Sequence, residues 1–307
     1  MNIYDDLSLV IVSYRSEKLI LKNLDILKKF KTIIIDNSNS SELELIVKYI
    51  NNITLIKSPK NLGYGRAVNL AVRNVDTTFI LTINPDLILN EDSIKVLFEV
   101  FLKDQDNIGI LAPSLFDEKM KNRSHGTISI LEKLNGRKVS DSLNNIAVGN
   151  TCCNFLMGSC YLMKRDFFNI LGGFDESFFM YYEDNDLCDR SIQAGKYIME
   201  VPSSKFIHLG DSSSEKKIFT GTKLSIIHKI SSYLYLRKKT SIFFFVFQIV
   251  KNFCDYFQRL IFNFLKLKFK KSYKESECVR ESLYFRTRSF ESARGKKTSS
   301  RGRCRSL

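Results

Sequence analysis

The sequence lacks the features of a secreted or membrane-spanning protein. Its seven cysteines form no Cys-x-x-Cys pair, and an odd number in a chain of 307 residues favours reduced thiols over a disulfide framework. No basic segment followed by an apolar one stands at the N-terminus, so we expect no signal peptide. The most apolar run of the C-terminal third, residues 242–250, is far shorter than the roughly 20 residues that cross a bilayer. These absences predict a cytoplasmic protein.

Acidic residues are scarce in the last third of the chain. Residues 215–307 contain 23 Lys+Arg but only 6 Asp+Glu, whereas residues 1–214 contain 24 Lys+Arg and 27 Asp+Glu. The basic third also alternates Lys/Arg with aromatic residues, a pattern typical of helices that lie on an anionic membrane. The alternative is that these helices pack on the rest of the protein or on a second subunit. The mildly acidic body carries no nucleic-acid-binding motif, so we expect no nucleic-acid partner.

This asymmetry predicts three segments. Residues 1–214 would form the main domain, and residues 215–285 a basic amphipathic helical extension that associates with a membrane. Residues 286–307 hold eight Lys+Arg, one acid and many Ser and Gly residues, and we expect a disordered basic tail.

Strand-like and helix-like segments alternate in the first hundred residues. Amphipathic spacing predicts helices between short buried runs, for example at residues 43–50. The buried β-branched runs predict four strands, at residues 7–14, 32–35, 53–56 and 79–83. This alternation favours a parallel α/β sheet. Ser13, Asp36 and Asp86 stand at or just past the carboxyl ends of three strands, the edge where open α/β sheets bind ligands.

Each of these signals has a structural alternative. Asp36 could accept a hydrogen bond from a nucleobase or ribose, or could be a turn residue. The glycine turn Asn61–Gly65 could bring backbone N–H groups to a phosphate, or could be a plain tight turn. Asn84-Pro85-Asp86 could offer oxygen ligands to a divalent cation, or could simply end a strand.

The densest group of acids lies between residues 172 and 190. It holds six acids within fifteen residues, among aromatic rings: Asp175, Glu176, Glu183, Asp184, Asp186 and Asp189. Acids in an apolar setting are costly unless a metal, a sugar or a proton from a hydroxyl uses them. Asp186 and Arg190 have the i, i+4 spacing of a structural pair. Asp184, near a helix start, can stay ionised and act as a general base.

Together these motifs resemble the inverting family 2 glycosyltransferases of the GT-A fold. Within that family they are most similar to the bacterial rhamnosyltransferase group that builds surface polysaccharide. The resemblance covers about residues 7–240 and is most specific from Gly158 to His208. It implies a Rossmann-like, mainly parallel sheet flanked by helices, followed by the basic-aromatic helical extension.

The resemblance also implies roles for individual residues. Asp184 matches the catalytic base, with Glu183 beside it, and Asp175 and Glu176 match acceptor-side positions. The last Asp of the family's DxD motif, here Asp86, ligates Mg²⁺ or Mn²⁺, and in some members a histidine matched by His208 completes the metal shell. The positions expected to contact the donor are Ser13, Asp36, Asn61, Gly63, Gly65, Arg66, Asn69, Asn84 and Asp86.

The implied reaction is a single displacement with inversion at the sugar. We expect L-rhamnose to move from dTDP-rhamnose to a glycan acceptor, lipid-linked, in surface polysaccharide or O-antigen biosynthesis. A UDP-sugar donor (galactofuranose, hexose or N-acetylhexosamine) and a non-catalytic scaffold of the same fold are the alternatives. The expected partners are a nucleotide-sugar, a lipid-linked glycan and an anionic membrane surface, with oligomer formation left open. The expected location is the inner face of the cytoplasmic membrane, through peripheral association.

Overall fold

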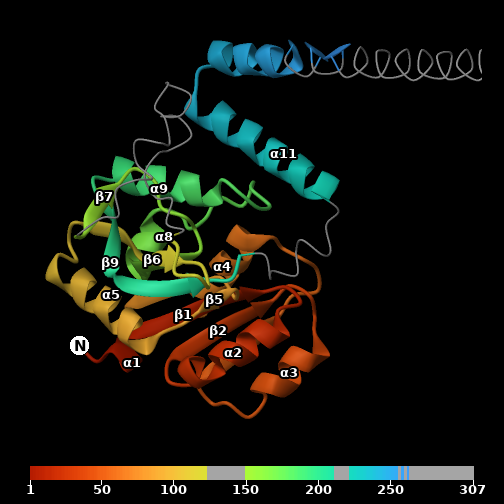
Figure 1. Cartoon of the computed structure of the whole chain (residues 1–307). Coiled ribbons are helices and arrows are strands. Elements are labelled where there is room, and N and C mark those ends of the chain that lie inside the picture. The colour runs from red at the N-terminus through yellow and green to blue at the C-terminus, as the bar shows by residue number, and fades with distance from the viewer. Residues whose placement is uncertain (123–148, 211–220, 255–256, 259–260, 263–307) are drawn as a thin grey trace, which may run out of the picture. The chain divides into compact units, whose positions relative to one another are not determined.

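One mixed sheet organises the described part of the chain (Figure 1). A computed structural model describes residues 1–122, 149–210, 221–254, 257–258 and 261–262. The chain divides into two units, Met1–Lys239 and Thr240–Leu307. The predicted tail at 286–307 lies outside the described residues, as do residues 215–220, 255–256, 259–260 and 263–285 of the predicted extension.

The strand order is β3-β2-β1-β4-β8-β6-β9-β5, and β7 pairs with β9. The strands are β1 (Leu7–Ser13), β2 (Lys31–Asp36), β3 (Ile53–Lys57), β4 (Phe79–Ile83), β5 (Leu87–Ile88), β6 (Ile108–Phe116), β7 (Thr151–Cys153), β8 (Cys160–Lys164) and β9 (Tyr197–His208). The first four form a parallel sheet, which confirms the prediction from the buried runs. β8 then pairs antiparallel with β4 and β6, while β9 runs parallel to β6.

Helices cover both faces of this sheet. The described helices of the first unit are α1 (Ile3–Asp6), α2 (Glu17–Leu27), α3 (Ser41–Val47), α4 (Tyr64–Val72), α5 (Glu91–Lys103), α8 (Arg165–Ile170), α9 (Glu183–Gln193) and α11 (Gly221–Lys239), the last of which packs on the segment before α9 rather than on the sheet. β1 is buried throughout because its side chains alternate between two cores. Leu9 and Ile11 pack with α2, α3 and α5, whereas Val10 and Val12 pack with α4, α8 and α9.

The parallel strands end together at one edge of the sheet. Ser13 at the end of β1 pairs in register with Asp36 at the end of β2. Asn84 and Asp86 follow directly after β4, the other neighbour of β1. Because carboxyl ends of parallel strands meet at one edge, the predicted donor-side residues are brought to one region.

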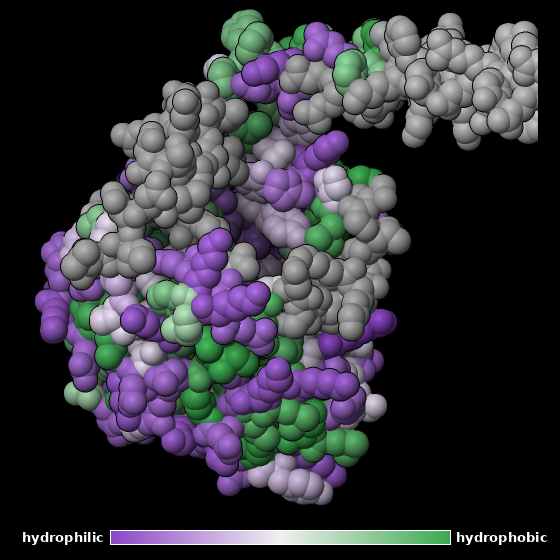
Figure 2. All heavy atoms as spheres, in the orientation of Figure 1, coloured by the Kyte–Doolittle hydropathy of each residue, from purple (hydrophilic) through white to green (hydrophobic). Residues whose placement is uncertain are grey.

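The described part of the second unit is helical at residues 242–254. Its side chains are largely apolar and exposed, including Phe243 at 85%, Phe247 at 60% and Phe253 at 68%. Figure 2 shows hydrophobic side chains of this segment among the grey atoms at the top of the view. Within the described residues, no helix has both the length and the apolar character required to cross a membrane.

Candidate active site

A cavity of about 280 Å³ opens where the parallel strands end. Its lining comes from segments that are far apart in the sequence: Tyr14 and Ser16 after β1, Asn37 after β2, Asn61 and Gly63 before α4, Asn84 and Asp86 after β4, Gly158 and Ser159 before β8, and Met180, Tyr181, Glu183 and Asp184 at the start of α9. The cavity therefore places a carboxylate of α9 across from the carboxyl edge of the sheet.

Asp184 lies in the first turn of α9, where the helix dipole favours a carboxylate. Its Oδ1 accepts hydrogen bonds from the backbone N–H of Asn185 (2.9 Å) and from the Asn185 side-chain amide (3.1 Å). Its Oδ2 accepts one from the backbone N–H of Gly158 (3.2 Å). In the described part of the chain, no ion pair reaches Asp184. Burial raises the pKa of Asp184 above its ordinary value, and the N–H donors oppose that shift.

The backbone just before Asp184 is strained. Tyr181 and Tyr182 both adopt left-handed conformations, with φ of 70° and 71°. Such a conformation costs a non-glycine residue roughly 1–2 kcal/mol, and it persists only where neighbouring structure holds it. The turn directs the chain from the cavity wall into α9, so its geometry sets the position of Glu183 and Asp184.

Asp86 and His208 lie side by side, although they come from opposite ends of the domain. Antiparallel pairing of β5 with β9 sets Leu87 opposite His208, and the Leu209 N–H donates to the Asp86 carbonyl. His208 Nε2 lies 3.3 Å from Asp86 Oδ2. Asp86 Oδ1 is buried and has no hydrogen-bond partner in the part of the chain that the structure describes.

This pair suits a divalent cation. A buried carboxylate oxygen without a partner is costly unless something else satisfies it, and carboxylate oxygen is a preferred ligand of hard cations. Within the described residues, no group of three or more His, Cys, Asp or Glu is placed to hold a metal ion. The remaining ligands would have to come from water and a bound diphosphate, which is how Mg²⁺ is commonly held.

Asp36 lies next to the cavity rather than in its lining. Its Oδ1 accepts from the N–H and hydroxyl of Ser38 (2.8 and 2.6 Å), and its Oδ2 accepts from the N–H of Ser40 (2.5 Å). Asn37 lines the cavity instead. Its amide donates to the Gly63 carbonyl at 3.1 Å, so it joins the ends of β2 and the glycine turn. Asn37 was not among the site residues predicted from the sequence, although its position directly after Asp36 could have indicated it.

The glycine turn packs against the segment that precedes α9. The Tyr64 N–H donates to the Phe179 carbonyl (3.1 Å), so that donor is engaged within the protein. Gly63 has φ of 79°, and a Cβ there would lie 2.0 Å from the Phe179 carbonyl oxygen. A Cβ at Gly65 would lie 2.9 Å from the Phe174 Cβ. Both glycines are required by this close approach.

Helix α4 holds the same segment further along. Asn69 donates to the Phe174 carbonyl and accepts from the Phe174 N–H, both at 2.8 Å. It also donates to Glu176 Oε1 at 3.2 Å, and Arg66 Nε donates to the Glu176 carbonyl at 2.7 Å. Arg66 and Asn69 therefore tie the predicted donor side to the predicted acceptor side. Their contact with a donor stays a prediction.

Comparison with known proteins identifies the fold. A model described as "Glycosyl transferase family 2" matches residues 8–166, more than half of the chain. The chain belongs to this family. A mannosyltransferase from Pyrobaculum calidifontis, solved in complex with GDP-Man and Mn²⁺, superposes with a TM-score of 0.50 at 13% identity, covering 74% of this chain and 64% of that one. This likeness concerns the fold, which is of the GT-A type.

Three relatives have activities in their names. A low-salt glycan biosynthesis hexosyltransferase of Haloferax volcanii is 32% identical over 202 residues, 61% of this chain and 62% of the relative. An N-acetylglucosaminyl-diphospho-decaprenol L-rhamnosyltransferase of Mycobacterium tuberculosis is 25% identical over 233 residues, 68% and 75% of the two chains. The rhamnosyltransferase WbbL of Escherichia coli is 29% identical over 252 residues, 75% and 92%. The chain thus spans less than two thirds of the first of these relatives.

The stretch matched by the family 2 model ends before α9. It contains Asp36, the glycine turn and Asp86, but neither Asp184 nor His208. Of the residues predicted for the site, six line the cavity: Asn61, Gly63, Asn84, Asp86, Glu183 and Asp184. His208 contacts one of these, while Ser13, Asp36, Gly65, Arg66, Asn69, Asp175 and Glu176 lie outside the lining. Ser13 is fully buried, and its Oγ has no hydrogen-bond partner among the residues described.

Proposed function

We propose that this chain is an inverting glycosyltransferase that moves L-rhamnose from dTDP-L-rhamnose to a lipid-linked glycan acceptor. One observation carries the proposal: Asp184 and Asp86 line the same cavity of about 280 Å³. The two carboxylates differ in their surroundings. Among the described residues, Asp184 is held by N–H donors only, whereas Asp86 lies beside His208 and keeps one oxygen without a partner. Different surroundings suit different roles, one in proton transfer and one in binding the donor.

In this mechanism Asp184 accepts the proton of the acceptor hydroxyl as that oxygen attacks the anomeric carbon of the sugar. The bond to the nucleoside diphosphate breaks on the opposite face, so one displacement inverts the configuration, as in inverting hydrolysis with a hydroxyl in place of water. Asp86 and His208 would hold a Mg²⁺ or Mn²⁺ ion, which offsets negative charge on the diphosphate. The cavity would bring the donor sugar and the acceptor hydroxyl together in the orientation that the displacement needs.

The choice of sugar rests on the relatives. Two of the three reported relatives are named as rhamnosyltransferases, and one name includes a diphospho-decaprenol acceptor. A hexose from a UDP donor is the second candidate, because the relative with 32% identity is named a hexosyltransferase.

A comparison of donor binding separates the rhamnose donor from the hexose donor. We expect dTDP-L-rhamnose, in the presence of Mn²⁺ or Mg²⁺, to raise the thermal midpoint of unfolding more than UDP-hexoses do. Transfer to N-acetylglucosaminyl-diphospho-polyprenol would then be followed by mass spectrometry.

Removing the Asp86 carboxylate should abolish the cation's effect on donor binding. In the wild-type chain, dTDP should raise the thermal midpoint strongly only when Mn²⁺ is present. In Asp86→Ala, Mn²⁺ should add nothing, because the oxygen that has no protein partner is gone. Asp92→Ala removes an exposed carboxylate elsewhere and should respond like wild type. A full Mn²⁺ response in Asp86→Ala would contradict the proposed cation site.

We also propose that the second unit associates peripherally with an anionic membrane. Its described helix exposes Phe243, Phe247 and Phe253, and the chain from residue 215 onward has 23 Lys+Arg against 6 Asp+Glu. Apolar rings that enter the interface and basic residues that meet anionic lipids act together in such binding.

Replacing these three phenylalanines by serine should weaken vesicle binding about 30-fold or more, since partial burial of three rings is worth at least about 2 kcal/mol. Sedimentation with vesicles containing phosphatidylglycerol measures this. A control with Ile226→Ser changes an exposed residue of the first unit and should bind as wild type does. Unchanged sedimentation of the triple variant, with loss of a dimer instead, would contradict the membrane assignment and favour a second copy of the chain as partner.

A further inference from the structure

Helix α11 lies outside the stretch matched by the family 2 model, yet it packs on the segment that leads into α9. The Ser231 hydroxyl is buried and donates to the Met180 carbonyl at 2.7 Å. The fully buried Tyr235 ring lies 5.7 Å from the ring of Tyr182 and shares a small core with Phe178. These contacts fix both ends of the segment from Phe178 to Tyr182.

The contacts coincide with the strained turn. The His228 ring lies 5.4 Å from the Tyr181 ring and 5.1 Å from the Tyr182 ring. Tyr181 and Tyr182 are the consecutive residues of this turn that have positive φ. A left-handed pair of tyrosines does not hold that conformation by itself, so surrounding contacts must stabilise it. On one side the Tyr64 N–H binds the Phe179 carbonyl, and on the other side α11 supplies the hydroxyl and the rings.

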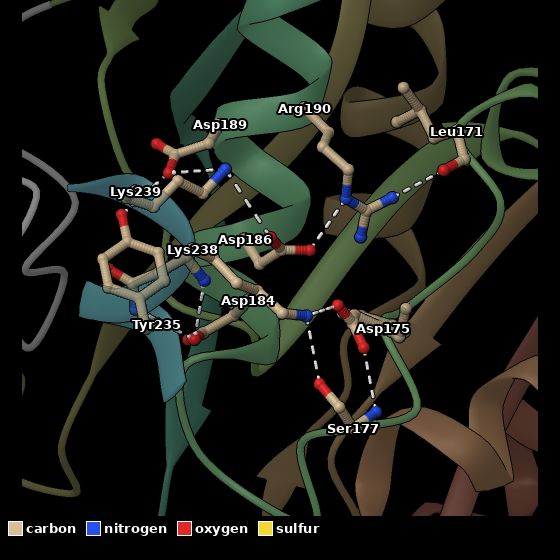
Figure 3. A network of polar contacts seen from close by, with 12 residues as sticks. Leu171, Asp175, Ser177, Asp184, Asp186, Asp189, Arg190, Tyr235, Lys238 and Lys239 are labelled. Atoms are coloured by element: carbon tan, nitrogen blue, oxygen red, sulfur yellow. Dashed lines mark hydrogen bonds and ion pairs between the residues drawn. The ribbon is translucent and has the colours of Figure 1, made fainter. Parts of the chain in front are cut away.

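The end of α11 also compensates the acids around Asp184 (Figure 3). Lys239 lies 3.2 Å from Asp189 and 3.6 Å from Asp186, and the Tyr235 hydroxyl donates to Asp189 at 2.8 Å. Lys238 pairs with Asp175 and lies within 3.0 Å of the Ser177 hydroxyl. Asp184 receives none of these cations in the described part of the chain. The helix thus neutralises the neighbouring acids and leaves the cavity carboxylate to N–H donors alone.

We propose that α11 is a positioning element of the active site, which holds the left-handed turn at Tyr181 and Tyr182 and thereby sets where Asp184 meets the acceptor. This inference rests on the proposed role of Asp184 as the base. Tyr235 and Ser231 are its positioning residues, since neither lines the cavity and both act through the segment before α9. The basic end of α11 then serves the catalytic domain itself, in addition to any role of the second unit at a membrane.

The test compares Tyr235→Ala, Tyr235→Phe and Ser231→Ala in the full chain. Donor binding is measured by calorimetry with dTDP and Mn²⁺, and kcat is divided by the number of donor molecules bound per chain, which corrects for unfolded protein.

We expect Tyr235→Ala to lower this corrected kcat at least about 10-fold, because small misplacements of a reacting group are costly. Ser231→Ala should lower it about 3-fold, and Tyr235→Phe should stay near wild type because it keeps the ring. Donor affinity should change less than about 3-fold in all three. Ile230→Ala, at an exposed position of the same helix, is the matched control.

The outcomes are separable. A corrected kcat within twofold of wild type in both Tyr235→Ala and Ser231→Ala would overturn the positioning role, even if the thermal midpoint falls. A loss in Tyr235→Phe equal to that in Tyr235→Ala would also overturn it, since the ring would then be irrelevant. Activity retained in Asp184→Asn would overturn the assignment of Asp184 as the general base and hence the proposed function, whatever the α11 variants show.

Discussion

Replacing Asp184 by Asn should lower kcat for sugar transfer about 1,000-fold, within the 10²–10⁴ range of a general base, while donor affinity stays within twofold. The amide fits the same space and can still accept the Asn185 N–H hydrogen bond, but it cannot take a proton. Donor affinity should hold because Asp86, His208 and the ends of β1, β2 and β4 are untouched. Calorimetry with dTDP and a transfer assay with the same protein measure the two quantities.

The matched control is Asp166→Asn, which makes the same chemical change at an exposed carboxylate of α8. It should leave kcat unchanged. Residual turnover of Asp184→Asn above about one tenth of wild type would show that another group takes the proton.

The pH dependence follows from the same carboxyl. Burial raises the pKa of Asp184, so its protonated, neutral form persists to higher pH than that of an ordinary aspartate. Only the carboxylate can act as base, and kcat should therefore fall as the pH is lowered through the raised pKa. In the plot of kcat against pH, the wild-type protein should lose half of its activity on the acid side at a pH above that at which a solvent-exposed aspartate is half protonated. Asp184→Asn should show no such loss, and its residual rate should stay flat.

Replacing Gly63 by Ala should destabilise the protein by about 3 kcal/mol or more, since strain at positive φ and a clash with a carbonyl add together. The new Cβ would lie 2.0 Å from the Phe179 backbone oxygen, and backbone cannot rotate away as a side chain can. Relief of the clash would push the segment before α9 outward and carry Asp184 with it. Urea unfolding should show the loss of stability, and kcat of the folded fraction should fall with it.

Gly195 offers a control for a methyl group added at positive φ without a steric clash. It has nearly the same φ, 77° against 79°, but a Cβ there meets nothing within 4 Å. Gly195→Ala should therefore cost only the conformational strain, about 1–2 kcal/mol, with kcat unchanged. Equal losses in the two variants would mean that the close approach to Phe179 does not add to the cost.

The parts of the fold that could be predicted are those that depend on local sequence. Buried β-branched runs gave β1 to β4, and the i, i+4 spacing gave the Asp186–Arg190 pair, which the structure confirms at 2.7 Å. The antiparallel insertion of β8 between β4 and β6 was not predicted, because pairing partners depend on contacts distant in the chain.

The site divides in the same way. Residues at the ends of strands could be placed from the sheet edge alone, whereas the nearness of Asp86 and His208 came only from the family resemblance. The sequence did not indicate which residues the basic and aromatic side chains of α11 contact. Lys239 and Tyr235 pack on acids and rings of α9 and its preceding turn, which only the folded chain brings together.

The pairing of β9 has a consequence for the order in which this protein is completed during synthesis. β9 joins β5, β6 and β7, all of them earlier in the chain, and it ends at His208. Such long-range pairings form late because a large loop must close first. A growing chain that ends before β9 can build the parallel half of the sheet but lacks His208, and α11 arrives later still. Newly made chains should therefore remain unable to act on their substrates until almost the whole first unit has been translated.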